Sequence, residues 1–64
     1  MKMKDLKKRE IAINLKALSA RMFYSSETIK EIYGKEAANA HELSGAAKQV
    51  LGWSRDILKE LENG

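Results

Sequence analysis

The chain has 64 residues, a net charge of +3, one His, and no Cys or Pro. A chain of this length forms one domain at most, and a lone core of this size gives only marginal stability. The lack of Cys excludes disulfides and thiolate metal sites. His41 has no acidic residue or second His at the spacing of a helical metal site. We expect no metal and no cofactor, which leaves self-association as the source of added stability.

The sequence contains no candidate membrane segment. Its apolar runs are too short to cross a bilayer, and no signal-peptide core follows the N-terminal lysines. We therefore expect a soluble protein without membrane contact, located in the cytoplasm of a cell or of an infected host cell.

The first predicted helix covers about residues 4–33. Its apolar residues follow each other at alternating steps of four and three, which is a heptad seam typical of a helix packed lengthwise against another. Apolar residues beside the seam widen it, as expected of a helix with more than one neighbour. The seam consists of Ile11, Leu15, Leu18, Met22, Ser25, Ile29 and Ile32.

Gly34 is the only strong helix breaker near the middle of the chain. Glycine closes helices at their C-terminal end, so we predict a turn at about residues 34–36. Thr28 with Glu31 fits a capping box, so a further break at residues 25–28 remains an alternative. One continuous helix in a long coiled coil is a second alternative, because no Pro enforces a break.

The second predicted helix covers about residues 37–62, and Asn39 with Glu42 fits a capping box at its start. It has a heptad seam of its own, made of Ala40, Leu43, Ala47, Val50, Ser54, Ile57 and Leu61. We therefore predict an all-α fold in which residues 1–64 form one antiparallel helical hairpin. We expect this hairpin to assemble as a homo-oligomer, most simply a dimeric four-helix bundle.

In length and architecture alone, this plan is similar to that of small plasmid-encoded RNA-binding hairpin proteins that dimerise into four-helix bundles. None of their functional residues can be matched to this sequence, so the resemblance implies no site.

Candidate partner-binding residues are aromatic residues and glycines. A Gly inside a helix costs about 1 kcal/mol relative to Ala, so two of them seven residues apart indicate the close approach of another group. Adjacent aromatics cannot both face one core, and an aromatic beside a small residue is favoured at interfaces. The candidates are Phe23, Tyr24, Gly45, Gly52 and Trp53.

The first part of the chain is a basic arm. Residues 1–24 contain seven Lys or Arg and two acidic residues, whereas residues 25–64 contain five and seven. Cations at the start of a helix oppose its macrodipole, so contact with phosphates is one reason for them, and a solubilising terminus is the other. The candidate contacts for an anion or nucleic acid are Lys4, Lys7, Lys8 and Arg9.

Catalysis finds no support in the sequence. His41 and Ser44 are three residues apart, but a helix surface offers no oxyanion pocket for such a pair. No phosphate-binding loop is present, and Lys30 stands where a helix-turn-helix needs a small residue.

The leading hypothesis is a non-enzymatic helical interaction protein, a regulator, inhibitor or adaptor, that binds a protein partner. The alternatives are a nucleic-acid-binding dimer that uses the basic arm, and an oligomer that sequesters a small anionic ligand between subunits.

Overall fold

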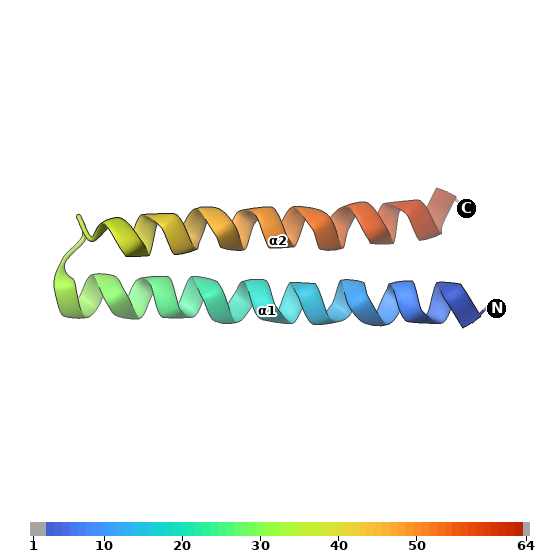
Figure 1. Ribbon diagram of the computed structural model, residues 1–64, viewed down its shortest axis with the longest axis horizontal. Coiled ribbons are helices and arrows are strands. Elements are labelled where there is room, and N and C mark those ends of the chain that lie inside the picture. The colour runs from blue at the N-terminus through green and yellow to red at the C-terminus, as the bar shows by residue number, and fades with distance from the viewer. Residues whose placement is uncertain (1–2, 64) are drawn as a thin grey trace.

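The computed structural model describes residues 3–63, which form two α-helices joined by a short turn. Helix α1 covers Met3–Tyr33 and helix α2 covers Ala38–Asn63. The helices run antiparallel and side by side, so both chain ends lie at the end opposite the turn (Figure 1). The hairpin is a rod of 47 × 14 × 11 Å. The all-α hairpin predicted from the sequence is confirmed, with helix boundaries within one residue of those expected.

Helix α1 is continuous, so both alternatives to a two-helix hairpin are wrong. Residues 25–28 are helical, and the chain turns back after Tyr33. The Thr28 hydroxyl donates to the carbonyl of Tyr24, four residues earlier, at 3.1 Å. A hydroxyl that donates to the carbonyl of the preceding helical turn does not cap the start of a new helix.

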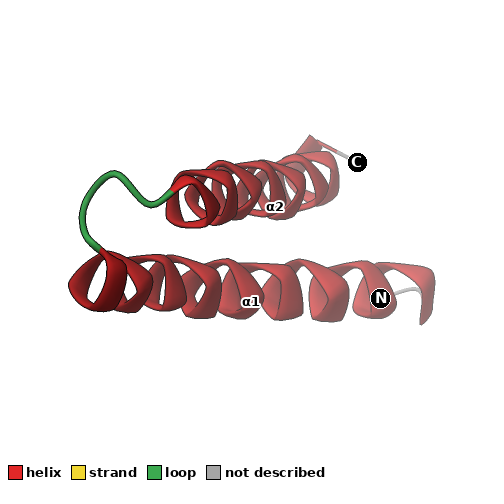
Figure 2. Ribbon diagram, turned by 60° about the vertical axis from the view of Figure 1, so that its left-hand side comes forward, coloured by secondary structure: helices red, strands yellow, loops and turns green. Residues whose placement is uncertain are grey.

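The turn depends on the backbone of Gly34. Its φ of +100° lies in the left-handed region that favours glycine, and its amide donates to the Lys30 carbonyl at 2.8 Å. The Ala37 amide then donates to the Gly34 carbonyl at 3.2 Å and closes the loop drawn in green in Figure 2. Asn39 lies inside the first turn of α2, so the capping box predicted for it is wrong: the helix starts earlier, at Ala38.

The two helices meet along a row of small residues, which we call the contact row. Its members recur every seven residues in each helix, and each has at most 1% of its surface exposed. Side chains this small allow the two backbones to approach closely. The contact row consists of Ala12, Ser19 and Ser26 in α1 and Ala40, Ala47 and Ser54 in α2.

Hydrogen bonds between the helices fix their register. Each serine hydroxyl of the contact row donates to the carbonyl of an alanine in the opposite helix, so no serine is buried without a partner. In each pair the two residue numbers add up to 66, which places residue n of α1 level with residue 66 − n of α2. The pairs are Ser19 with Ala47 at 2.9 Å, Ser26 with Ala40 at 2.8 Å, and Ser54 with Ala12 at 2.6 Å.

The seam predicted for the second helix is confirmed, since its seven residues are buried or half-buried. The seam predicted for the first helix is wrong at every second position. Ile11, Leu18, Ser25 and Ile32 are exposed, and the residues that face α2 are the contact-row members one position later. The reason is steric: the helices approach along the line of smallest side chains, which turns the larger neighbours outward.

Candidate interaction surface

Beside the contact row, one face of the hairpin is covered by large apolar side chains. The residue one before and the residue three after a contact-row member lie on the same side of a helix, because successive residues are about 100° apart. We call this surface the apolar face. It consists of Ile11, Leu15, Leu18, Met22, Ile29 and Ile32 of α1 and Leu43, Ala46, Val50, Trp53 and Ile57 of α2.

The apolar face is partly open to solvent in the single chain: five of its eleven members are exposed, five are half-buried and Val50 is buried. The exposed fraction is 52% for Ile11, 41% for Leu18, 66% for Ile32 and 51% for Trp53. The face contains no charged residue between residues 11 and 32 of α1 or between residues 39 and 57 of α2. Ser25 and Asn39 are the only polar residues at its heptad positions in these two ranges. Exposed apolar surface without charges is typical of sites that bind another molecule.

An ion pair closes the apolar face at the end where the chain termini lie. Lys8 Nζ contacts Glu60 Oε1 at 2.7 Å. Their hydrogen bond and mutual attraction raise the pKa of Lys8 above its ordinary value and lower the pKa of Glu60 below its own. The pair joins the same flank of both helices, which confirms that these flanks share one face.

The opposite face of the hairpin carries cations from both helices, and we call it the basic face. Here lie the residues one and four positions after the members of the contact row. Phe23 sits among them half-buried, at the height of Leu43 and Ser44. The cations are Arg9, Lys16 and Lys30 of α1 and Lys48 and Arg55 of α2. The acidic Glu27 and the exposed apolar Ile13 lie on the same face.

The structure does not bring the five predicted partner-binding residues together. Trp53 lies on the apolar face and Phe23 on the basic face, while Tyr24 is 75% exposed on the outer side of α1. Gly45 and Gly52 lie on the outer side of α2, where an added Cβ would meet nothing within 4 Å. The close approach predicted at these glycines does not occur within the chain, because the helices meet along Ala40, Ala47 and Ser54 instead.

Only part of the basic arm forms a cluster. Lys4, Lys7 and Lys8 are spaced i, i+3 and i+4 and lie on one side of α1, whereas Arg9 lies about 100° further round the helix. Lys8 is engaged with Glu60, and of the four only Arg9 belongs to the basic face.

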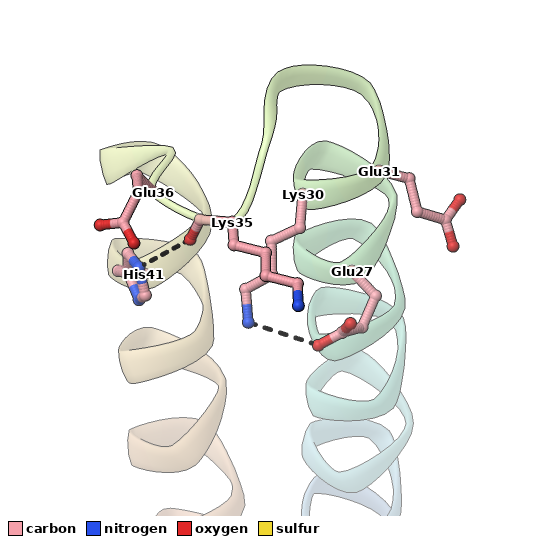
Figure 3. A pocket seen from close by; sticks show the side chains of 6 residues that line it. All are labelled: Glu27, Lys30, Glu31, Lys35, Glu36 and His41. Carbon is pink, nitrogen blue, oxygen red and sulfur yellow. Dashed lines mark hydrogen bonds and ion pairs between the residues drawn. The ribbon is translucent and has the colours of Figure 1, made fainter.

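An open groove of about 580 Å³ lies where the helices approach the turn. Its lysines, carboxylates and imidazole largely balance one another in charge: Lys30 contacts Glu27 at 3.5 Å, and His41 Nε2 donates to the Lys35 carbonyl at 3.1 Å (Figure 3). Glu31 extends away from the other side chains in Figure 3. The groove is lined by Glu27, Lys30, Glu31, Lys35, Glu36 and His41.

Among residues 3–63, no three His, Asp or Glu side chains are grouped so that they could hold a metal ion. Neither α1 nor α2 combines the length and the apolar content that crossing a bilayer requires.

The contact row is the feature that sequence reasoning missed in α1. Its signal was present, since Ala12, Ser19 and Ser26 repeat every seven residues as Ala40, Ala47 and Ser54 do in α2. Large apolar residues dominated the pattern in α1 and concealed the row of small ones beside them.

Comparison of the chain with protein-family models, with curated proteins and with solved structures found no match.

Proposed function

We propose that this chain is a non-enzymatic helical interaction protein that acts as a homo-oligomer and binds through its apolar face. The observation that carries the proposal is how little the single hairpin buries. The largest side chains with less than 2% of their surface exposed are serines, while the large residues Ile11, Ile32 and Trp53 are more than half exposed. A chain that buries so few large side chains gains little from the hydrophobic effect by itself.

The accessible surface supports the same proposal. A compact monomer of 7.2 kDa has an accessible surface of about 4,100 Å² by the usual scaling with mass, whereas this hairpin has 5123 Å². The excess of about 1,000 Å² is close to the roughly 800 Å² that each partner buries in a standard protein interface. A second layer of helices on the apolar face would remove most of it.

Light scattering and sedimentation at micromolar concentration test this proposal. We expect at least twice the monomer mass for the wild type. Leu18→Glu places a charge in the middle of the apolar face, and we expect it to give monomers with much lower thermal stability, because an interface does not tolerate an unpaired buried charge. Tyr24→Glu is the matched control, since Tyr24 is exposed outside the face, and it should leave the mass unchanged. A wild-type chain that is monomeric and well folded at every concentration would overturn the proposal.

The same surface would serve for binding a partner protein. Where a binding partner other than a second copy exists, it would compete for the apolar face, so Leu18→Glu would abolish its binding as well. Trp53 is the residue of that face best suited to anchor a partner, because tryptophan carries a large share of binding energy in protein interfaces.

The second candidate function is the binding of a nucleic acid or another anion, and the basic face favours it. Cations from both helices lie there, and the same face carries Phe23, an aromatic ring of the kind on which bases stack. The test is a variant in which Arg9, Lys16, Lys48 and Arg55 are all changed to Gln. If nucleic acid is the partner, its affinity should fall steeply in this variant and also with added salt, while the oligomer mass stays unchanged. A matched variant with Lys4, Lys7, Lys35 and Lys59 changed to Gln removes the same number of cations outside the basic face and should lose much less affinity.

A further inference from the structure

The two borders of the apolar face carry opposite charges. Along the α1 border the charged residues are all basic, and along the α2 border they are all acidic. Each border consists of the residues two positions after the contact-row heptad position. Its charged members are Lys7 and Arg21 in α1 and Glu42 and Asp56 in α2, and its neutral members are Asn14, Thr28, Gln49 and Asn63. Lys4 and Glu60 continue the heptad positions of Ile11 and Trp53 at the end of the apolar face.

We propose that a second copy of this chain docks on the apolar face with its α1 over α2 of the first copy, and its α2 over α1. The two-fold axis then runs parallel to the helices, between the two layers. This arrangement rests on the self-association proposed above and goes beyond it, because it specifies which helices meet and in what register. It places the basic border of each copy over the acidic border of the other.

The register of the hairpin determines which charges meet. A two-fold axis parallel to the helices keeps every residue at its height along the rod, so residue n of one α1 stands level with residue 66 − n of the other copy's α2. Arg21 is then level with residue 45, about 4.5 Å along the axis from Glu42 of the second copy. Lys7 is level with residue 59, between Asp56 and Glu60 of the second copy.

Side-chain sizes across the apolar face agree with this arrangement. Ile11 and Trp53 lie at nearly the same height in each hairpin, and so do Leu18 and Ala46. When α1 covers α2 of the second copy, Leu18 lies near Ala46 of that copy, so a large side chain meets a small one. The Ile11 and Trp53 side chains of both copies come together one layer further along.

The other two-fold stacking of these faces has its axis perpendicular to the helices. It places α2 over α2 and α1 over α1. The acidic border of one copy, with Glu42 and Asp56, then lies against the same border of the other, and the basic borders meet in the same way. Like charges in proximity disfavour this assembly. The charge pattern therefore selects the first arrangement.

Charge reversal at Arg21 and Glu42 tests the arrangement in the full-length chain at low ionic strength. In a homodimer of Arg21→Glu, or of Glu42→Arg, two symmetry-related contacts change from attraction to repulsion, so we expect each single variant to dissociate at roughly tenfold higher concentration than the wild type. The double variant should return to within about twofold of the wild type. An equimolar mixture of the two single variants should form heterodimers in preference to either homodimer.

Lys48→Glu is the control, because Lys48 is exposed on the opposite face of the hairpin and its reversal changes the net charge by the same amount as Arg21→Glu. It should leave the dissociation constant within about twofold of the wild type. Circular dichroism checks that each variant keeps its helix content. A Glu42→Arg dimer as tight as the wild type or tighter, or a double variant without rescue, would overturn this arrangement while leaving self-association intact. A wild type that stays monomeric would overturn the proposed function and this arrangement together.

Discussion

The contact row and the apolar face lie side by side on the same helices, and both repeat every seven residues. The contact row has only Ala and Ser and is fully buried, whereas the apolar face has mostly Ile, Leu, Met and Trp, and about half of its residues are exposed. The difference shows that two properties of a heptad pattern can be separated. Small side chains determine where the two helices of one chain meet, and the large side chains beside them remain available for a second molecule.

Enlarging the contact row should have the largest effect on stability. In Ala47→Leu a branched side chain must fit where Ala47 is fully buried and where its carbonyl accepts the Ser19 hydroxyl. Overpacking of this kind costs about 1–3 kcal/mol of unfolding free energy. Here the larger side chain also increases the distance between the two helices. Urea unfolding followed by circular dichroism measures the loss.

Ala17→Leu is the control for that change, because Ala17 is exposed on α1 outside the contact row. It makes the same substitution in a helix and should change the unfolding free energy by less than about 0.5 kcal/mol. Equal losses in the two variants would show that the small size of contact-row residues has no special role.

Removing one interhelical hydroxyl should have a smaller effect. Ser19→Ala keeps the small volume but loses the hydrogen bond to the Ala47 carbonyl, which lowers the unfolding free energy by about 1 kcal/mol. Ser44→Ala is the matched change outside the contact row and the apolar face, and it corrects for the higher helix propensity of Ala. If the two substitutions change the unfolding free energy by the same amount, the buried hydrogen bonds do not stabilise the hairpin.

Part of the fold could be predicted from the sequence. The two helices and the turn at Gly34 were predictable, because they follow from local helix propensity and from a single helix breaker. The side of α2 that packs against α1 was also predictable, because Leu43, Val50 and Ile57 alternate there with small residues and α2 has no stronger apolar stripe. The side of α1 that packs against α2 was not predictable, because the stripe of large residues from Ile11 to Ile32 is a stronger signal than the row of small ones.

The candidate site could be predicted only in part. The sequence predicts Trp53 as a partner-binding residue, and Trp53 lies on the apolar face, which also contains the large residues of the seam predicted for α1. The surface itself was hidden, because it combines flanks of two helices, and a flank can be identified only once the contact row is known. The basic face was hidden for the same reason: Lys48 and Arg55 come close to Arg9 and Lys16 only through the hairpin register.

Replacing Gly45 distinguishes the outer side of α2 from the two faces. Since an added Cβ at Gly45 meets nothing within 4 Å, Gly45→Ala should raise the unfolding free energy by about 0.5–1 kcal/mol through helix propensity alone. The oligomer mass should not change. Loss of oligomers or of partner binding, despite higher helix stability, would show that a partner approaches this outer side and would return Gly45 to the interaction surface. Gly45→Leu would amplify the same contrast.

The smallest effect is expected at the Lys8–Glu60 ion pair, whose side chains are partly exposed and screened by solvent. The lowered pKa of Glu60 means that the pair contributes stability above the ordinary carboxyl pKa and loses it as the pH falls through the folded value. The raised pKa of Lys8 means that the contribution is also lost as the pH rises through the folded value of the amine. Between these limits the wild type should melt slightly higher than Glu60→Gln at low salt, and the two melting temperatures should converge once the pH is below the folded pKa of Glu60. The difference should also shrink in high salt, because exposed charges are screened. A difference that persists in acid would mean that Glu60 stabilises this end of the apolar face by packing and not by its charge.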